Sequence, residues 1–176
     1  GRMVFRGVTT NPPLCLQAIQ VAPGYWSDRI RAIAHDFPAG DVEGVYWEMY
    51  LEIVRKGADM ILPVFKASGG KYGMISGQVD PRLVREGDKM LEQGLAIAAQ
   101  GENVMVKIPG SKEGYEVIEE LTARGISTNN TTSFTVPQYL RCMAAVSAGL
   151  LRANAIGVDL SRWRSVITHM SARLGE

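Results

Sequence analysis

Short apolar runs alternate with longer amphipathic stretches along this chain, and the alternation predicts an α/β fold. The apolar runs predict five β-strands, over Val4–Thr10, Gly73–Val79, Asn103–Ile108, Ile126–Thr131 and Val166–His169. Apolar residues at helical spacing predict helices over Pro13–Gln20, Ser27–His35, Val42–Lys66, Pro81–Gln100, Lys112–Arg124 and Thr135–Ile156. Strands that alternate with helices form right-handed βαβ units and a parallel sheet. The pattern leaves two closures open, a doubly wound sheet or part of a (β/α)8 barrel.

Three local signals place helix ends. Asp80 followed by Pro81 suits a helix start, because aspartate caps and proline fits the first turn. Thr135 and Gln138 form a capping-box sequence before the last long helix. Gly125 suits the end of a helix, since glycine readily adopts the left-handed conformation found there.

A lysine interrupts the most apolar of the predicted strands. Alternation places Lys107 on the same face as Met105, near the C-terminal end of that strand. An amine that is desolvated there has a depressed pKa and can act as an unprotonated nucleophile at neutral pH. The alternative is a lysine that extends out of the strand end and pairs with a loop carboxylate.

Polar residues recur at the C-terminal ends of the other predicted strands. They are Thr9 and Asn11, then Ser76, Gln78 and Asp80, then Asn129 and Thr131, and finally Thr168 followed by Arg173. Side chains that converge at the C-terminal ends of successive parallel strands mark the place where a barrel enzyme has its site. Single residues of this kind are often helix caps or turn formers, and Asn11, Asp80 and Thr135 fit that interpretation.

Composition narrows the class of protein. Hydrophobic residues at 46% and charged residues at 21% are typical of a soluble globular chain. With 19 basic and 18 acidic side chains, the net charge of +1 predicts neither a nucleic-acid partner nor a membrane surface. No apolar run approaches the roughly 20 residues of a membrane span. Cys15 and Cys142 are too few for a disulfide framework, which favours a cytoplasmic location, and no metal site is expected.

Four segments, in this order and spacing, resemble the transaldolase family of Schiff-base-forming class I aldolases. They are Gly7–Leu14, Gln78–Leu83, Asn103–Gly110 and Gly125–Phe134. The resemblance extends to about Gly175 and implies a (β/α)8 barrel fold. About five of the eight strands would be present, in one truncated domain over residues 1–176.

The resemblance also implies a mechanism. Lys107 would form an imine with a ketose carbonyl, and carbon–carbon cleavage would leave a three-carbon enamine for transfer to an aldose phosphate. Such chemistry belongs to carbohydrate metabolism and the pentose phosphate pathway, with sugar phosphates as substrates. No cofactor or metal is implied, because the lysine iminium itself is the electron sink.

Further roles follow from the same resemblance, position by position. Asn11 and Asn129 match residues that hold substrate hydroxyl groups. Thr131 matches the residue that positions the catalytic water. Thr168 and Arg173 match the loop that reaches the sugar and its phosphate, where a guanidinium fork suits a phosphate.

Two residues depart from the transaldolase pattern. Gln78 stands where glutamate is usual, and an amide cannot take or give the proton that activates water. Glutamine there resembles the fructose-6-phosphate aldolase branch, which cleaves without transferring, whereas Asn129 favours the transaldolase branch. Met170 stands where an aromatic ring is usual.

The length is a further departure. By this resemblance the first, seventh and eighth strands are missing, and five strands cannot close a barrel. We therefore expect a homo-oligomer that covers the open sheet edges, or an ordered fragment of a longer protein.

Three functional hypotheses follow. The first is a transaldolase-type transferase centred on Lys107. The second is a catalytically impaired partial barrel that self-associates, suggested by Gln78, Met170 and the missing strands. The third is a fructose-6-phosphate-aldolase-like enzyme, suggested by Gln78 alone.

Overall fold

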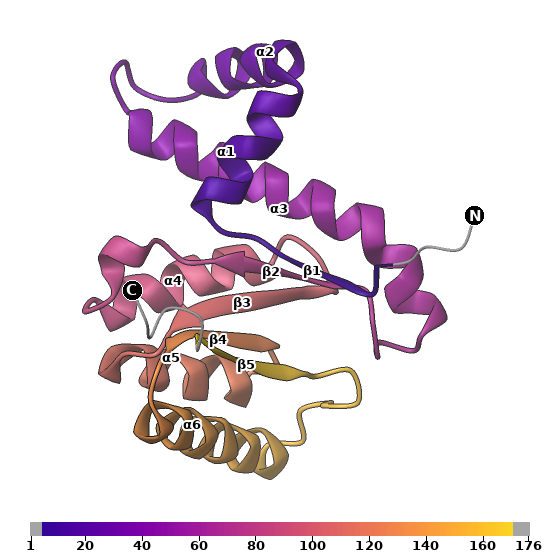
Figure 1. The fold of residues 1–176 in the computed structure, drawn as a ribbon, viewed down its shortest axis with the longest axis vertical. Coiled ribbons are helices and arrows are strands. Elements are labelled where there is room, and N and C mark those ends of the chain that lie inside the picture. The colour runs from indigo at the N-terminus through magenta and orange to yellow at the C-terminus, as the bar shows by residue number, and fades with distance from the viewer. Residues whose placement is uncertain (1–4, 171–176) are drawn as a thin grey trace.

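The computed structural model describes residues 5–170, in which strands and helices alternate as expected (Figure 1). The strands are β1 (Gly7–Thr9), β2 (Met74–Gln78), β3 (Val104–Pro109), β4 (Thr128–Ser133) and β5 (Ser165–His169). The helices are α1 (Pro12–Val21), α2 (Pro23–Ala34), α3 (Val42–Ala67), the 3₁₀ turn η1 (Pro81–Leu83), α4 (Gly87–Ala98), α5 (Lys112–Ala123) and α6 (Val136–Ala155).

The strands form one parallel sheet whose spatial order is the order of the chain, β1-β2-β3-β4-β5. A doubly wound sheet reverses its strand order partway across. A sequential order with the helices on the outer side is instead the arrangement of a (β/α)8 barrel. Figure 1 shows α4, α5 and α6 following one another along that side. The chain is therefore a partial barrel of parallel strands.

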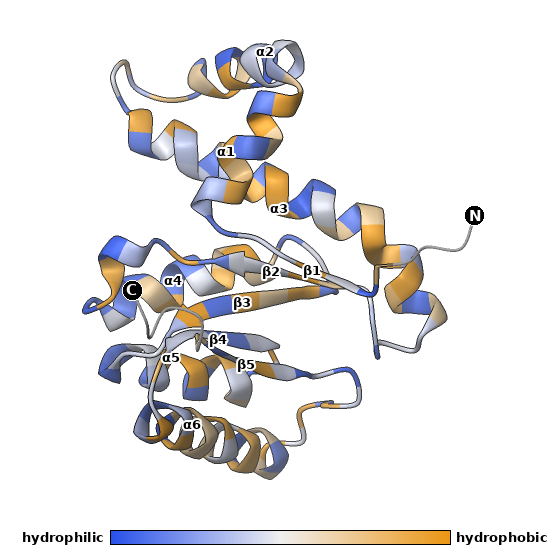
Figure 2. Ribbon diagram, viewed as in Figure 1, coloured by the Kyte–Doolittle hydropathy of each residue, from blue (hydrophilic) through white to orange (hydrophobic). Residues whose placement is uncertain are grey.

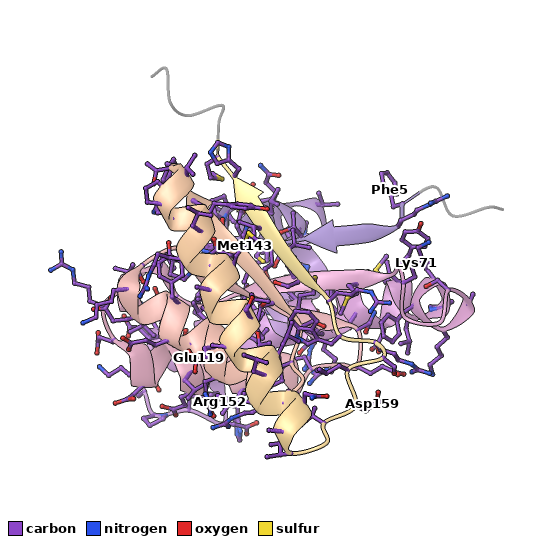
Figure 3. All side chains as sticks on the ribbon, turned by 90° about the horizontal axis from the view of Figure 1, so that it is seen from below. Phe5, Lys71, Glu119, Met143, Arg152 and Asp159 are labelled. Atoms are coloured by element: carbon purple, nitrogen blue, oxygen red, sulfur yellow. The ribbon has the colours of Figure 1, made fainter. Side chains whose placement is uncertain are left out.

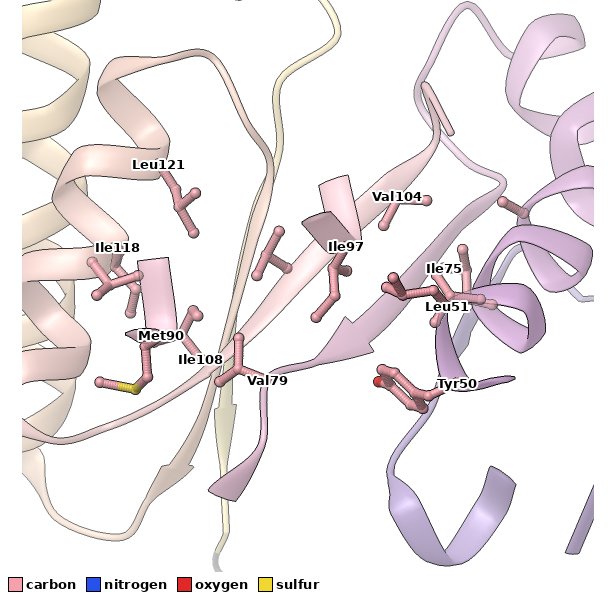
Figure 4. Packing of buried hydrophobic residues seen from close by; sticks show 14 of the residues in the cluster. Tyr50, Leu51, Ile75, Val79, Met90, Ile97, Val104, Ile108, Ile118 and Leu121 are labelled. Atoms are coloured by element: carbon pink, nitrogen blue, oxygen red, sulfur yellow. The ribbon is translucent and has the colours of Figure 1, made fainter. Parts of the chain in front are cut away.

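The main core lies between the outer face of the sheet and the helices. Val104 and Ile108 of β3 belong to the same buried cluster as Ile97 of α4 and Leu121 of α5 (Figure 4). Burying one such side chain contributes about 1.5–3 kcal/mol, whereas an exposed ion pair contributes about 0–1 kcal/mol. Apolar packing of the helices therefore holds the strands in place.

Helices α5 and α6 approach closely along one stretch. A Cβ at Gly149 of α6 would lie 2.6 Å from the Cβ of Thr122 on α5, so only glycine fits there without displacement. Arg152 of α6 donates to Glu119 of α5 over 3.2 Å, and Figure 3 labels both residues on these adjacent helices. Tight backbone contact and surface charge pairing thus align the two helices.

Helix α3 contributes Tyr50 and Leu51 to the main cluster, and a second, smaller cluster joins it to α2. Trp26 and Ile33 of α2 pack with Met49 of α3, and Arg29 of α2 pairs with the buried Glu52 of α3 over 2.7 Å. Figure 2 shows apolar and polar positions interleaved along these helices, as expected for amphipathic elements. No helix in the described residues is long and apolar enough to cross a membrane.

The predicted helix Pro81–Gln100 is wrong at its start. Asp80 accepts a hydrogen bond from the Arg82 N–H over 2.8 Å. The turn that it caps is the short 3₁₀ helix η1, which ends at Leu83. The Ser111 hydroxyl donates to the Val84 carbonyl over 2.9 Å, and the chain then enters a separate helix, α4. A side-chain cap and a contact from another loop therefore replace the continuous helix.

Other ends differ by a few residues or agree. The predicted helix Ser27–His35 begins earlier, because Pro23 occupies its first turn. The predicted strand Ile126–Thr131 begins two residues later and extends to Ser133. The capping box of Thr135 is confirmed, as is the end of α5 before Gly125, whose φ is +74°.

Candidate active site

A cavity of about 520 Å³ lies on the face of the sheet opposite the main core, and all five strands contribute to it, β4 through Asn129 alone. Its polar strand residues are Thr9, Ser76, Lys107, Asn129, Ser165 and Thr168. The alternation of side chains along a strand explains which residues line the cavity. On β3, Met105 and Lys107 face the cavity, while Val104 and Val106 pack in the core. The cavity is therefore the interior of the partial barrel.

The Lys107 side chain is buried on this inner face, with 9% of the residue exposed. Its Nζ donates to the Thr10 carbonyl oxygen over 3.4 Å. Burial lowers the pKa of Lys107 below its ordinary value, because the charged amine loses hydration. The structure thus contradicts the alternative in which Lys107 leaves the strand end and pairs with a loop carboxylate. An amine with a lowered pKa on a rigid strand can attack a carbonyl carbon.

Three polar side chains form a hydrogen-bonded chain across the inner face. Asn129 is the register partner of Lys107 on β4, and its Nδ2 donates to the Ser76 Oγ over 3.0 Å. The Thr168 Oγ1 donates to the Asn129 Oδ1 over 3.1 Å. Because β3 lies between β2 and β4, the bond from Asn129 to Ser76 requires a curled sheet, as in a barrel wall. These two hydrogen bonds fix the orientation of the Asn129 amide beside the lysine.

Gln78 is the register partner of Lys107 on β2. It lines a second cavity, of about 230 Å³, together with Tyr46, Trp47 and Tyr50 of α3. Its backbone N–H donates to the Tyr50 hydroxyl. One of the two positions that depart from the transaldolase pattern therefore lies on the strand next to the lysine.

The remaining predicted site residues have different settings. Thr131 is buried on β4 just before Thr132, whose φ of +54° marks an irregularity in the strand. Asn11 caps α1, and its Oδ1 accepts from the Leu14 N–H over 2.9 Å. Arg173 lies outside the described residues. The structure thus brings together Lys107, Asn129 and Thr168, with Gln78 beside them by register.

Three residues of this region received no individual role from the sequence, although Ser76 was among the polar residues expected at the strand ends. Ser76 shares a strand face with Gln78, and that pattern is visible in the sequence. Thr10 contributes its backbone carbonyl, which any residue could supply, so no sequence signal exists. Tyr50 reaches β2 from α3, 28 residues away in the chain, and local periodicity does not predict a contact over that separation.

The described residues contain no group of three or more histidine, cysteine, aspartate or glutamate side chains placed to share a metal ion. The arrangement that they do contain is a desolvated amine next to fixed amide and hydroxyl groups. Chemically, this suits imine formation with a carbonyl compound that carries hydroxyl groups.

The chain is similar to known proteins over nearly all of its length. The family described as Transaldolase/Fructose-6-phosphate aldolase matches residues 2–174. The chain is 36% identical over 170 residues to "Transaldolase 1" of Streptomyces avermitilis, an alignment that covers 96% of this chain and 44% of the relative. Identity is 33% to "Transaldolase" of Mycobacterium ulcerans, with 96% and 45% covered, and 31% to "Transaldolase" of Thiobacillus denitrificans, with 96% and 46% covered. The chain thus spans less than half the length of these relatives, and it belongs to the transaldolase/fructose-6-phosphate aldolase family.

Proposed function

We propose that the chain carries the Schiff-base site of a transferase that moves a dihydroxyacetone unit between ketose and aldose phosphates. The observation that carries the proposal is the burial of Lys107 in the barrel interior. This burial lowers the pKa of its amine. The names of the relatives favour transfer over simple cleavage.

The reaction would proceed through the Lys107 Nζ. The amine attacks the ketose carbonyl carbon, and loss of water gives an iminium ion. The hydroxyl group on the departing carbon loses its proton, and the iminium accepts the electron pair of the carbon–carbon bond that breaks. This step releases an aldose and leaves a three-carbon enamine, and the acceptor's carbonyl oxygen takes up a proton when the new bond forms. The enamine then attacks the carbonyl carbon of the acceptor aldose, and water hydrolyses the new iminium to regenerate the amine.

The polar residues around the lysine would hold the sugar. Asn129 and Thr168 present an amide and a hydroxyl in fixed orientation, which suits substrate hydroxyl groups. Asn11 uses its oxygen as a helix cap, so its amide N–H groups remain to donate. Thr131 would position the water, and Arg173 would bind the phosphate.

One observation favours a second candidate function, cleavage in the manner of a fructose-6-phosphate aldolase. Gln78 pairs with Lys107 in the register of β2 and β3. Its amide cannot carry a proton to or from water, so the acid–base step at this position must differ from that of a glutamate enzyme.

Borohydride trapping tests the imine directly. Fructose 6-phosphate is added with borohydride, and peptides are mapped by mass spectrometry. We expect a reduced adduct on Lys107 that is absent from Lys107→Met. Lys71→Met is the matched control, because Lys71 lines the same cavity yet is exposed, and it should leave the adduct unchanged.

The outcome separates the hypotheses. An adduct on Lys107 establishes imine chemistry, after which the ratio of transfer to cleavage distinguishes the two enzymes. A folded chain without an adduct would instead favour the catalytically impaired barrel that self-associates. The cytoplasmic location, the homo-oligomer and the single domain over residues 1–176 stay predictions.

A further inference from the structure

The hydrogen-bond ladder between β1 and β2 breaks beside Lys107. The Thr10 N–H donates to the Ser76 carbonyl over 3.0 Å. In a regular parallel ladder the next bond would run from the Gln78 N–H to the Thr10 carbonyl. The Gln78 N–H donates instead to the hydroxyl of Tyr50, and the Thr10 carbonyl accepts from the Lys107 Nζ. A tyrosine from α3 has thus replaced a backbone acceptor.

Tyr50 is held firmly in this position. Only 2% of its surface is exposed, and its ring stacks on Trp47 with 5.6 Å between the ring centroids. Burial raises the pKa of Tyr50 to about 12, so the hydroxyl keeps its proton at neutral pH. The Thr10 Oγ1 lies beside this hydroxyl and itself donates to the Ser76 carbonyl over 2.7 Å. It therefore has lone pairs left to accept the Tyr50 O–H.

We propose that Tyr50 is a positioning residue for Lys107: its hydroxyl takes the Gln78 N–H out of the ladder, so the Thr10 carbonyl is not shared with that N–H when it accepts from the lysine amine. The proposal rests on the proposed function only in assigning the reaction to Lys107. The phenol does not touch the reacting atoms, and it acts through the Thr10 carbonyl.

The consequence is electrostatic. A carbonyl acceptor stabilises the protonated amine more than the neutral amine, so this bond partly opposes the effect of burial on Lys107. The other charged side chains that line the cavity are Arg6, Lys71 and Arg164, and like charges also favour the neutral amine. Without the Tyr50 hydroxyl, the Gln78 N–H would return to the Thr10 carbonyl, and the carbonyl shared between two donors would bind the charged amine less strongly. The pKa of Lys107 would then fall further.

Competitive labelling of lysines measures this effect without any enzyme activity. The whole chain is treated with a trace of acetic anhydride at a series of pH values, and peptide mass mapping gives the labelling of each lysine. We expect Tyr50→Phe to move the midpoint for Lys107 to lower pH by roughly 0.5–1 unit, because the hydrogen bond to the charged amine is weakened, whereas its complete loss would shift the midpoint by about 1–2 units. The midpoints of the other lysines in the same digest should not move.

Tyr46→Phe is the matched control. Tyr46 lies on the same helix and stacks against Tyr50, with 6.4 Å between the ring centroids, and 39% of it is exposed. Its variant removes a hydroxyl from the same aromatic stack without reaching the ladder. An unchanged Lys107 midpoint in Tyr50→Phe, or an equal shift in both variants, overturns the proposal.

A second variant covers the case in which Tyr50→Phe does not fold. Thr10→Val removes the hydroxyl group that can accept the Tyr50 O–H, and it keeps the Thr10 carbonyl. Because Tyr50 is then held less well against the Gln78 N–H, the Lys107 midpoint should shift in the same direction. If neither shift occurs, the proposal fails. The labelling experiment does not depend on imine formation, so a chain that traps no sugar would refute the proposed function and leave this test intact.

Discussion

Lys107 shows how the surroundings of one side chain lower its pKa. The β-strand backbone presents it on the inner face, and the only hydrogen bond described for its Nζ runs to the Thr10 carbonyl. Removing water from an amine disfavours the charged form, whereas a carboxylate nearby would restore it. Gln78, on the adjacent strand, is uncharged, so it does not stabilise the charged form of the Lys107 amine as a carboxylate would.

Replacing this amide by an acid tests the balance. Gln78→Glu adds a group that can carry a proton to and from water, so we expect the ratio of transfer to cleavage to rise by roughly tenfold or more, which is less than the factor of about 100 to 10,000 that general acid–base catalysis can contribute. The measurement is product analysis with fructose 6-phosphate and an acceptor aldose. Gln17→Glu, on the exposed surface of α1, adds the same charge elsewhere. An unchanged ratio in Gln78→Glu would remove this residue from the mechanism.

At the scale of elements, one buried carboxylate ties α2 to α3. Glu52 is 4% exposed and accepts from the Arg29 guanidinium, with Nη2 to Oε2 at 2.7 Å. Lys56, one turn along α3, lies 3.8 Å from the same carboxylate. The Arg29 guanidinium bond holds the pKa of Glu52 below its ordinary value, against the opposing effect of burial.

The lowered pKa predicts a pH dependence of stability. The folded chain binds fewer protons at Glu52 than the unfolded chain, so its contribution is present above pH 4.5 and is lost as the pH falls through the folded pKa. Glu52→Gln should reduce the free energy of unfolding by about 1–3 kcal/mol at pH 7. It should also flatten the decline of the urea midpoint below pH 4.5. Glu48→Gln, one turn earlier on α3, is the control, and an equal effect in both variants would contradict the assignment.

At the scale of the molecule, the sheet has two strands with a neighbour on one side only. Within the described residues, β1 pairs with β2 alone and β5 with β4 alone. Large apolar side chains are also exposed, including Leu16 and Val21 on α1 and Leu151 on α6. Unpaired strand edges and exposed apolar surface both favour association with another chain.

Association is measured by sedimentation equilibrium over a range of concentrations. We expect species heavier than the 19.2 kDa of one chain. Val8→Lys places a charge on the β1 edge, where Val8 is 41% exposed, and should weaken association. Ala39→Lys adds the same charge to the loop before α3 and should not. A chain that is strictly monomeric and unfolds cooperatively would contradict the need for covered edges.

The order of strands and helices could be predicted from the sequence because it depends on local periodicity. The apolar run around Lys107 and the capping box at Thr135 act within a few residues of themselves. The residues that reach the inner face also follow from alternation along each strand, as Lys107 and Asn129 show. Element ends were less accurate, because contacts such as that between Ser111 and Val84 join distant segments.

The sequence by itself determined an α/β chain with a lysine and polar residues at successive strand ends, since side-chain direction along a strand has a fixed period of two. Tertiary structure decided the sequential strand order that makes the sheet a barrel wall, because periodicity carries no information about which strand lies beside which. It also decided that Tyr50 meets Gln78 across 28 residues and that the Thr10 carbonyl accepts from Lys107. Those contacts depend on how far a sheet curls and how closely α3 packs on it, which no local pattern specifies.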